Sequence, residues 1–511
     1  MKKLLLALAA AVQLASPCTP ALAQSDATRL RVSNQFLSAI AIPEPRGQRH
    51  GWYMNHAGVS ETLMSLDYEL KLTPRLALSI ENKAPDTWVL KLRPGVLFHD
   101  GSPLDAAAVK ASFDGIGKTE ASSNARLLRL LDIAEISAEG MTVTFKTRQP
   151  NAAFPYALTE PSAAIVRNGT ATMPIIATGP FQFVSNDPNK RMVVKAFDKY
   201  WGGVPKVREI VIDSIPEAQT ARLALEAGDV DLVINYPETD FAKLAKANKG
   251  QRYVAPTTRL FFMAANTKTG PLADKRIRQA VSLAIDRDVI VDVALGGVGG
   301  TRAQSIFPSV MSAWVNPNLK LPYDPVRAKA LLAAAGATAG PDGMLRLNGV
   351  PLVLKLAIYE GRAAFKPTSE IVQAMLQAVG VKVEIRMGEY EANDVALKAG
   401  EIDLHLQAWG TAPQGDPGYF PETLLKTDAG LNNGRYSNPT LDALMAKARV
   451  EFNPATRHKQ VLDIQALIAD EMPLVPLFHS NQTSVGNGKV VGYRVHPAEA
   501  YMGTPLLGLA R

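Results

Sequence analysis

Hydrophobic and polar positions repeat with two different periods along this chain. Apolar and polar side chains alternate residue by residue at 87–92 and at 141–146, which predicts strands. The segment 276–285 has instead the spacing of an amphipathic helix, and further helices are predicted at 106–113 and 218–227. Strands and helices that follow one another over the whole length predict an α/β fold.

Capping and turn residues mark the ends of several of these elements. Asp105 is an N-cap residue directly before one predicted helix, and Gly228 directly follows another. The turn at 93–95 contains Pro and Gly. It predicts a hairpin between the strand that precedes it and a second short strand at 96–98.

A crossover unit is predicted in the second half of the chain. A strand at 352–358 is followed by a helix at 369–379, which ends at Gly380, and by a strand at 381–386. This order predicts two parallel strands joined by a helix. Ligands of open α/β sheets bind at the carboxyl ends of strands, and clefts between domains are favoured sites. We therefore expect a binding site at such a position.

Length and composition are those of a large globular protein. The chain has 511 residues, of which 47% are hydrophobic and 20% are charged. Because single cores stop growing at about 250–300 residues, we expect two or more domains. The net charge is +7, and it becomes +5 when Lys2 and Lys3 are removed with the leader described next. No basic cluster or basic–aromatic stripe occurs, so nucleic acid is not an expected partner.

Residues 1–23 have the three parts of a secretory signal peptide. Lys2 and Lys3 precede an apolar run at 4–14 that is too short to span a bilayer, and Ala21-Leu22-Ala23 fits a cleavage site. Cys18, the only cysteine, lies inside this segment directly after Pro17, where a lipid-anchor site would have a small residue. We expect cleavage without lipidation, and a mature chain that has no disulfide and no thiolate metal site.

Short motifs over nearly the whole mature chain resemble those of one protein family. The first is the stretch 74–105, PRLALSIENKAPDTWVLKLRPGVLFHDGSPLD. In order there follow Thr178-Gly179-Pro180-Phe181, Tyr200-Trp201-Gly202-Gly203, Ala227-Gly228-Asp229-Val230-Asp231, Asp274-Lys275-Arg276-Ile277-Arg278-Gln279-Ala280, Tyr323-Asp324-Pro325 and Tyr436-Ser437-Asn438-Pro439. Together they are similar to the extracytoplasmic solute-binding proteins of ATP-binding-cassette (ABC) importers, in the peptide- and nickel-binding family (family 5).

The resemblance implies a two-lobed periplasmic-binding-protein fold with a ligand cleft between the lobes. Two crossovers between the lobes would act as hinges for closure around the ligand. The implied limits are 24–262 with 480–511 for lobe I, 58–175 for a subdomain inserted in it, 263–479 for lobe II, and 262–266 and 476–480 for the crossovers.

The resemblance also implies the function of a periplasmic receptor, monomeric and without a cofactor, that delivers a solute to a membrane permease. We expect a short peptide or peptide-like solute, with a nickel or metallophore chelate as the alternative. A secreted hydrolase and a periplasmic chaperone are alternatives of another class. The chain has no Gly-x-Ser-x-Gly, His-Glu-x-x-His or Gly-x-x-x-x-Gly-Lys motif, so we do not expect an enzyme.

One loop of the family lies in the cleft, and in this chain it contains Trp409, which would pack on the ligand. Peptide-binding relatives place an aspartate three residues after this tryptophan, where it pairs with the amino terminus of the peptide. Here that residue is Ala412. Asp416 could substitute for the missing carboxylate, or it could form a turn with Pro417. The Trp-Gly pair followed by Asp-Pro is more similar to the nickel-binding branch.

Two further positions bear on the ligand. Arg362 follows the strand at 352–358, where relatives often hold an arginine for a ligand carboxylate, because a guanidinium can form two parallel hydrogen bonds with it. An arginine that lies on the surface and is exposed to solvent is an equally good interpretation of this position. Glu160 lies where nickel-chelate binders of the family carry an arginine, and this difference argues against a carboxylate-rich nickel chelate held in that way.

Three histidines could supply imidazole ligands for nickel, copper or zinc, namely His56, His405 and His479. No two of them have ligand spacing such as i, i+4, so we predict no metal site. Tyr53 and Asn55 precede a predicted strand–helix junction, and His56 follows directly after them; position alone makes the three candidates for the cleft.

Overall fold

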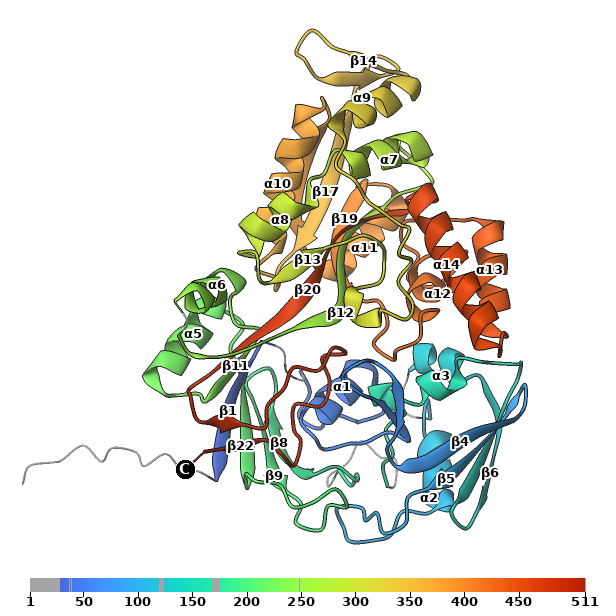
Figure 1. Ribbon diagram of the computed structural model, residues 1–511, viewed down its shortest axis with the longest axis vertical. Coiled ribbons are helices and arrows are strands. Elements are labelled where there is room, and N and C mark those ends of the chain that lie inside the picture. The colour runs from blue at the N-terminus through green and yellow to red at the C-terminus, as the bar shows by residue number, and fades with distance from the viewer. Residues whose placement is uncertain are drawn as a thin grey trace, which may run out of the picture.

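The computed structural model describes residues 28–35, 37, 39–118, 124–167, 175–247 and 249–510. The predicted signal peptide, with Cys18, lies outside these residues. Helices and strands alternate through the described chain and gather into two lobes, lobe I in the lower part of Figure 1 and lobe II in the upper part. The predicted two-lobed α/β fold is therefore confirmed, while the residue limits of the lobes stay predictions.

An eleven-stranded sheet runs through both lobes. Its strand order is β18-β17-β19-β12-β20-β11-β1-β10-β9-β8, and β13 pairs with β20 beside this path. The bounds are β1 Arg29–Asn34, β8 Phe181–Asp187, β9 Arg191–Ala196, β10 Glu209–Ser214, β11 Leu232–Ile234, β12 Gln251–Ala265, β13 Gly300–Arg302, β17 Val353–Tyr359, β18 Lys382–Gly388, β19 Leu404–Gly410 and β20 Leu474–Gly486.

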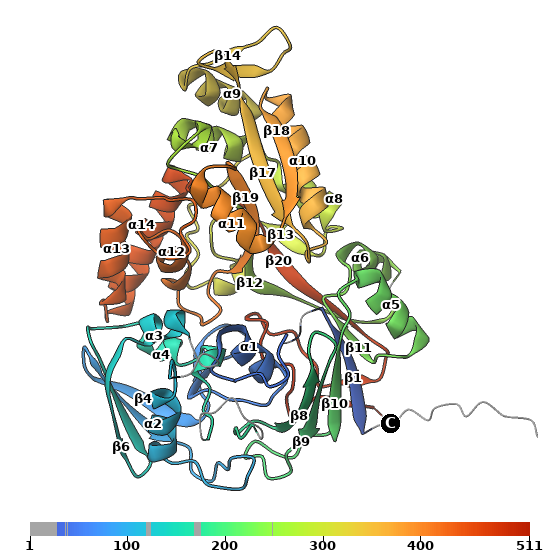
Figure 2. The same ribbon diagram turned by 180° about the vertical axis from the view of Figure 1, so that it is seen from behind.

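Two long strands of this sheet, β12 and β20, are shared by the lobes (Figures 1 and 2). The first part of β12 pairs with the end of β20, which also pairs with β11 of lobe I. The second part pairs with the start of β20 and with β19 of lobe II. Between these parts the register shifts, from Pro256 opposite Asn481 to Leu260 opposite His479. Such an irregularity bends a strand locally, so the two parts of the sheet meet at a bend.

Smaller sheets complete the molecule. A four-stranded antiparallel sheet, β4-β5-β7-β6, forms a subdomain at one side of lobe I. The remaining strands pair as β2 with β3, β14 with β15 and β16, and β21 with β22. The bounds are β2 Met64–Leu66, β3 Leu72–Pro74, β4 Ala77–Ala84, β5 Thr87–Leu92, β6 Ile133–Glu139, β7 Thr142–Thr147, β14 Ala337–Ala339, β15 Leu345–Leu347, β16 Val350–Pro351, β21 Val490–Val491 and β22 Gly508–Leu509.

Helices pack around the sheets of both lobes. In lobe I and its subdomain they are α1 Gln48–His56, α2 Ala106–Asp114, α3 Ala125–Leu131, α4 Phe154–Ala157, α5 Ala218–Ala227 and α6 Glu238–Lys246. In lobe II they are α7 Lys275–Leu283, α8 Arg287–Ala294, α9 Pro325–Ala334, α10 Phe365–Ala378, α11 Tyr390–Ala399, α12 Tyr419–Leu424, α13 Pro439–Arg449 and α14 Pro454–Glu471.

Local signals position several of these elements as predicted. Asp105 accepts a hydrogen bond from the backbone N–H of Ala108 at 2.8 Å and caps α2. Gly228 has a φ of 79° after α5, a left-handed conformation that favours glycine at a helix end. The crossover unit is also confirmed, because β17 and β18 are parallel, although α10 begins at Phe365 and not at 369.

The predicted strand at 96–98 is wrong. Its residues have only one isolated bridge, between Leu97 and Pro103, and both edges of β5 are occupied by β4 and β7. Val96 and Phe98 are buried in the core of the subdomain. A loop that buries every second residue has the same alternation as a strand, and this likeness misled the prediction.

Motifs that carry the family resemblance meet at one buried carboxylate. Glu61 is 2% exposed and accepts a hydrogen bond from Arg75 Nε at 2.6 Å. The Tyr200 hydroxyl and Trp201 Nε1 also donate to this carboxylate, at 2.8 Å and 3.0 Å. The guanidinium of Arg93 lies 4.3 Å from the centroid of the Trp201 ring. The first motif and the Tyr-Trp motif are thus parts of one structural corner.

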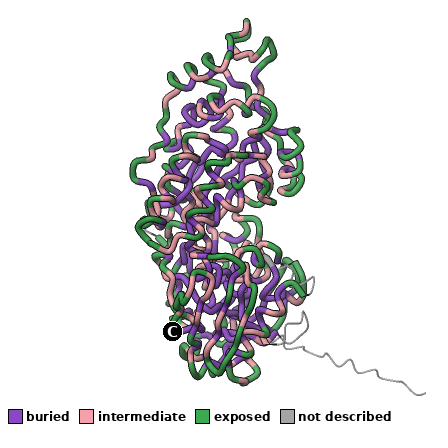
Figure 3. Tube along the Cα trace, turned by 90° about the vertical axis from the view of Figure 1, so that its right-hand side faces the viewer, coloured by how far each residue is buried: buried purple, intermediate pink, exposed green. Residues whose placement is uncertain are grey.

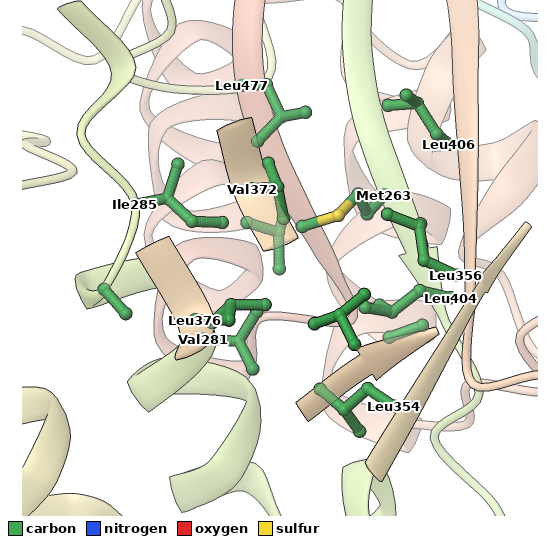
Figure 4. Close-up of a cluster of buried hydrophobic side chains, with 14 of the residues drawn as sticks. Met263, Val281, Ile285, Leu354, Leu356, Val372, Leu376, Leu404, Leu406 and Leu477 are labelled. Atoms are coloured by element: carbon green, nitrogen blue, oxygen red, sulfur yellow. The ribbon is translucent and has the colours of Figure 1, made fainter. Parts of the chain in front are cut away.

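Each lobe has a hydrophobic core of its own. The core of lobe II lies where β12, β17 and β19 meet α7 and α10, and Figure 4 shows side chains of this cluster, among them Met263, Leu356 and Val372. A second cluster, with Leu30 and Phe181, fills lobe I. Figure 3 shows buried segments in the interior of both lobes and exposed segments around their periphery. The two clusters lie in different lobes.

Candidate ligand-binding site

A cavity of about 340 Å³ lies at the junction of the two lobes. Its wall is built where parallel strands of both lobes end. Gln35, Ile215 and Asn235 directly follow β1, β10 and β11 of lobe I, and Tyr359 and Met387 stand at the ends of β17 and β18 of lobe II. Carboxyl ends of parallel strands are the usual place of ligand sites in open α/β sheets.

Arg362 lines this cavity from the loop between β17 and α10. The side chain is half-buried and hydrogen-bonded to Tyr359. Burial and the nearby charge of Arg259 lower the pKa of Arg362 from its usual value, and the charge of Glu499 opposes them. The arginine predicted from its position after a strand therefore lies in the wall of the cavity between the lobes.

Glu499, from the C-terminal segment, also lines the cavity, and Arg259 of β12 holds its carboxylate. Arg259 Nε donates to Glu499 Oε1 at 3.1 Å, and its Nη2 donates to the other oxygen. Burial alone would raise the pKa of Glu499, but Arg259 lowers it below its usual value. Sequence reasoning missed this pair, because 240 residues separate its members and neither lies in a recognisable motif.

Glu238, the first residue of α6, is a third charged residue of the wall that sequence reasoning missed. Its side chain is half-buried and makes no ion pair within 4.0 Å with any residue that the structure describes. Burial raises the pKa of Glu238, and the charge of Arg362 opposes this rise. The cavity wall therefore contains charged residues from both lobes, acidic and basic.

Trp409 lies one layer behind this wall. Its Nε1 donates to the Tyr390 hydroxyl at 3.0 Å, and the Tyr390 ring packs edge-to-face on Tyr359, with centroids 4.9 Å apart. Tyr359 in turn lines the cavity. Ala412, at the expected place of an amine-binding aspartate, is 0% exposed and packs in an apolar cluster with Phe420.

Asp416 makes structural contacts within lobe II. It is 5% exposed, pairs with Arg457 Nη2, and accepts a hydrogen bond from the backbone N–H of Gly418 at 2.7 Å. Asp416 is not among the residues of the cavity wall described above. These contacts match the turn interpretation of Asp416-Pro417, and a role in ligand binding stays a prediction.

Tyr53, Asn55 and His56 lie within α1 and not before a strand–helix junction. The half-buried Tyr53 packs against the core of lobe I, and Asn55 Nδ2 donates to the Ser60 carbonyl at 3.2 Å. The imidazole of His56 stacks on Trp52, with centroids 4.7 Å apart. Burial lowers the pKa of His56 to about 4, although Glu499 nearby opposes the shift. Glu499, which influences this pKa, is a residue of the cavity wall.

The other two histidine candidates have structural partners. His405 Nδ1 lies 3.0 Å from Asp394 Oδ1, and His479 Nε2 lies 3.1 Å from the Ser305 carbonyl oxygen. Both side chains are buried. The described part of the chain has no group of three or more His, Cys, Asp or Glu side chains that could hold a metal ion together.

Glu160 connects the subdomain with lobe II. Its carboxylate accepts a hydrogen bond from Arg126 Nη2 at 2.7 Å and another from Gln414 Nε2. Arg126 Nη1 also donates to the Tyr419 hydroxyl at 3.0 Å. The acidic residue that replaces the arginine of nickel-chelate binders is thus part of a contact between the lobes.

Sequence comparison agrees with this architecture. The family model of bacterial extracellular solute-binding proteins, family 5 (middle region), matches residues 71–431. The glutathione-binding protein GsiB of Pectobacterium atrosepticum is 27% identical over 456 residues, which are 85% of each chain. Among the described residues, no helix combines the length and the apolarity that crossing a membrane requires.

Two solved structures have the same fold. NikA from Brucella suis, in complex with Fe(III)-EDTA, superposes with a TM-score of 0.85 at 24% identity, and 94% of this chain and 99% of the other are covered. The oligopeptide-binding protein AppA of Bacillus subtilis, in complex with a nonapeptide, superposes with a TM-score of 0.78 at 23% identity and the same coverage. At these identities the likeness establishes the fold alone.

A two-lobed α/β fold with a cavity between the lobes is the architecture that this chain shares with the two solved structures. Because the family model spans more than half of the sequence, this chain belongs to the bacterial extracellular solute-binding proteins, family 5. Proteins similar to it are substrate-binding components of transport systems and not enzymes.

Proposed function

We propose that this protein is the periplasmic receptor of an ABC importer and that it binds a short peptide or peptide-like solute between its lobes. The observation that carries the proposal is Arg362, a half-buried guanidinium in the wall of a cavity where strand ends of both lobes meet. A guanidinium at such a place suits the carboxylate of a peptide. The glutathione-binding and oligopeptide-binding proteins that this chain resembles support the same class of solute.

The proposal includes the path to the membrane. The segment 1–23 directs export and is removed, and the mature chain acts as a monomer without a cofactor. Ligand binding closes the lobes about the bend in β12 and β20, near Pro256 and Asn481, where the register shifts. The closed form presents a surface from both lobes to the permease of the importer.

Arg362→Ala tests the ligand site. Hydrogen bonds to a charged group contribute about 1.5–3 kcal/mol, so we expect the affinity for peptides to fall about 10- to 100-fold. Isothermal titration calorimetry with di- to pentapeptides measures this change in affinity. Native mass spectrometry of protein that was purified without a refolding step identifies any solute that co-purifies.

Arg208→Ala is the matched control. This arginine is half-exposed, pairs with Asp198 on the surface of lobe I and lies outside the cavity. We expect it to bind peptides like the wild type. Equal affinities of Arg362→Ala and wild type would contradict the site, and binding of nickel with histidine, but of no peptide, would favour the nickel alternative.

A further inference from the structure

The two lobes are in direct contact at residues that do not line the cavity. Leu66 and Leu70, in the hairpin of β2 and β3, are buried in one hydrophobic cluster with Ala412 and Phe420 of lobe II. The backbones also approach closely here. A Cβ atom at Gly415 would lie 2.9 Å from Cδ2 of Leu66 and 3.0 Å from the carbonyl oxygen of Leu70. None of these residues belongs to the cavity wall.

Lobe II makes the reverse contact with the subdomain. Phe452, between α13 and α14, packs against the hydrophobic core of the subdomain, and its ring centroid lies 6.2 Å from that of Trp88. Next to it, the carbonyl of Arg449 accepts a hydrogen bond from the backbone N–H of Ala152 at 2.8 Å. Each lobe thus contributes apolar side chains to a hydrophobic cluster of the other.

Polar groups join the lobes beside these apolar contacts. Glu160 of the subdomain is 5% exposed and accepts hydrogen bonds from its neighbour Arg126 and from Gln414 of lobe II. Arg126 also donates to the hydroxyl of Tyr419 in α12, at 3.0 Å. Hydrogen bonds to charged groups are stronger than those between neutral groups. Apolar burial and charged hydrogen bonds therefore both favour the state in which the lobes touch.

Opening of the lobes must break these contacts. The subdomain is tied to the rest of lobe I through Glu61, which accepts hydrogen bonds from Tyr200 and Trp201. We therefore expect it to move with lobe I when the lobes turn about the bend near Pro256. The apolar side chains between the lobes would then be exposed to water, which costs free energy in proportion to their area.

We propose that Leu66, Leu70, Glu160, Gln414 and Phe452 form a latch that holds the lobes in contact when the cavity is empty. The closed state is then the major state of the protein without a ligand. The stabilisation comes from the protein alone, so the inference goes beyond the proposed function and holds for any solute. A closed state that is already populated also lowers the cost of closure on ligand binding.

The competing explanation is that a bound solute alone holds the lobes together. The contacts would then form only as a result of closure and would be too weak to maintain it. This explanation predicts that the ligand-free protein is mainly open. It also predicts that loss of the latch residues does not change the distance between the lobes in the ligand-free state.

Distances between spin labels distinguish the two explanations. Cys18→Ser leaves no native cysteine, so Lys146→Cys in β7 and Lys447→Cys in α13, both at exposed positions, can be labelled alone. Double electron–electron resonance then measures the distance between the subdomain and lobe II. Lys146→Cys with Lys195→Cys in β9 is the control pair, because both positions lie in lobe I.

The measurement needs protein without a bound solute. Native mass spectrometry identifies preparations that have the mass of the chain alone. A solute that co-purifies is removed by dialysis in guanidinium followed by refolding, and the far-ultraviolet circular dichroism spectrum is compared before and after this step.

In ligand-free wild type we expect one short distance between the labels at positions 146 and 447. The triple variant Leu70→Ala, Gln414→Ala and Phe452→Ala should lose at least about half of this population to a longer distance. The distance within lobe I should stay that of wild type. Leu128→Ala is the matched control, because it removes a leucine of the subdomain that is 45% exposed, and we expect wild-type distances.

Three results would overturn the inference. The first is a long distance as the main species of ligand-free wild type. The second is a triple variant with the wild-type distribution of distances. The third is a changed distance within lobe I in the triple variant, because the movement would then lie inside that lobe and not between the two.

Discussion

At the scale of single residues, Glu61 shows how a family motif can be structural. Its carboxylate is nearly inaccessible, is neutralised by Arg75, and accepts hydrogen bonds from Tyr200 and Trp201. A buried charge that loses its partner costs several kcal/mol, and the aromatic donors would also lose their acceptor. The motif residues at this corner therefore hold segments of lobe I together, and none of them lines the cavity described above.

Glu61→Ala should destabilise the protein by about 3–5 kcal/mol, because Arg75 is left without its buried partner. Urea unfolding followed by circular dichroism measures the change. Glu81→Ala removes a carboxylate from an exposed pair with Lys83 and should change the free energy of unfolding by less than about 1 kcal/mol. Equal effects of the two substitutions would contradict the assigned role of Glu61.

The charged residues of the candidate site were only partly predictable. Arg362 follows a predicted strand at a position where relatives of the family often hold an arginine, so the resemblance, and not local sequence alone, pointed to it. Arg259, Glu238 and Glu499 have no such signal, because they meet through contacts between distant segments of the chain. Trp409 was placed near the site, but its hydrogen bond with Tyr390 keeps it behind the wall.

At the scale of elements, three chain segments pass one another closely at glycines. They are the end of α1, the segment that contains Gly179 and the C-terminal segment that contains Gly503. A Cβ at Gly179 would lie 2.2 Å from the carbonyl oxygen of Gly58, and one at Gly503 would lie 2.2 Å from that of Ala57. Gly58 has a φ of 78° directly after α1. The Thr-Gly-Pro-Phe motif thus contains glycine because the end of α1 passes its backbone closely.

Gly179→Ala should lower the melting temperature by several degrees, since the new methyl group must displace backbone atoms and not a flexible side chain. Differential scanning calorimetry is the appropriate measurement. Gly430→Ala is the control, because no atom lies within 4 Å of the position that its new methyl group would take, and we expect a shift near zero. A Gly179→Ala protein as stable as wild type would contradict this prediction, because it would show that the two backbone segments can move apart here without a loss of stability.

Most elements were predictable because their signals are local. Asp105 and Gly228 act within one turn of the helices that they delimit, and the alternation at 87–92 matches β5. The strand prediction at 96–98 was wrong because a strand needs a partner, and β5 pairs instead with β4 and β7. Which segments pair is decided elsewhere in the chain. The helix that contains Tyr53 and His56 has no capping side chain at its start, so the sequence held little sign of it.

At the scale of the whole molecule, buried histidines link stability to pH. Burial lowers the pKa values of His56, His99, His479 and His496 to about 4. In the unfolded chain an imidazole titrates near pH 6.5. Between these values the unfolded state binds protons that the folded state does not, so the free energy of unfolding falls as the pH falls from about 6.5 toward 4.

His479→Gln should reduce this dependence on pH. At pH 5 one such histidine destabilises the fold by on the order of 1–2 kcal/mol relative to pH 7. The difference between the unfolding free energies at pH 7 and pH 5 should therefore be smaller in His479→Gln by about that amount. The same difference in variant and wild type would mean that folding does not lower the pKa of His479.

The shared strand β20 has a consequence for biosynthesis. Its partners β11, β12 and β13 are all made long before it, and Glu499, the acid that Arg259 holds in the cavity wall, is made later still. A ribosome-bound chain therefore cannot complete the central sheet or the ligand site until translation is nearly finished. Contacts between such distant segments form slowly, so pairing of β20 with its partners is expected to be a late step in folding.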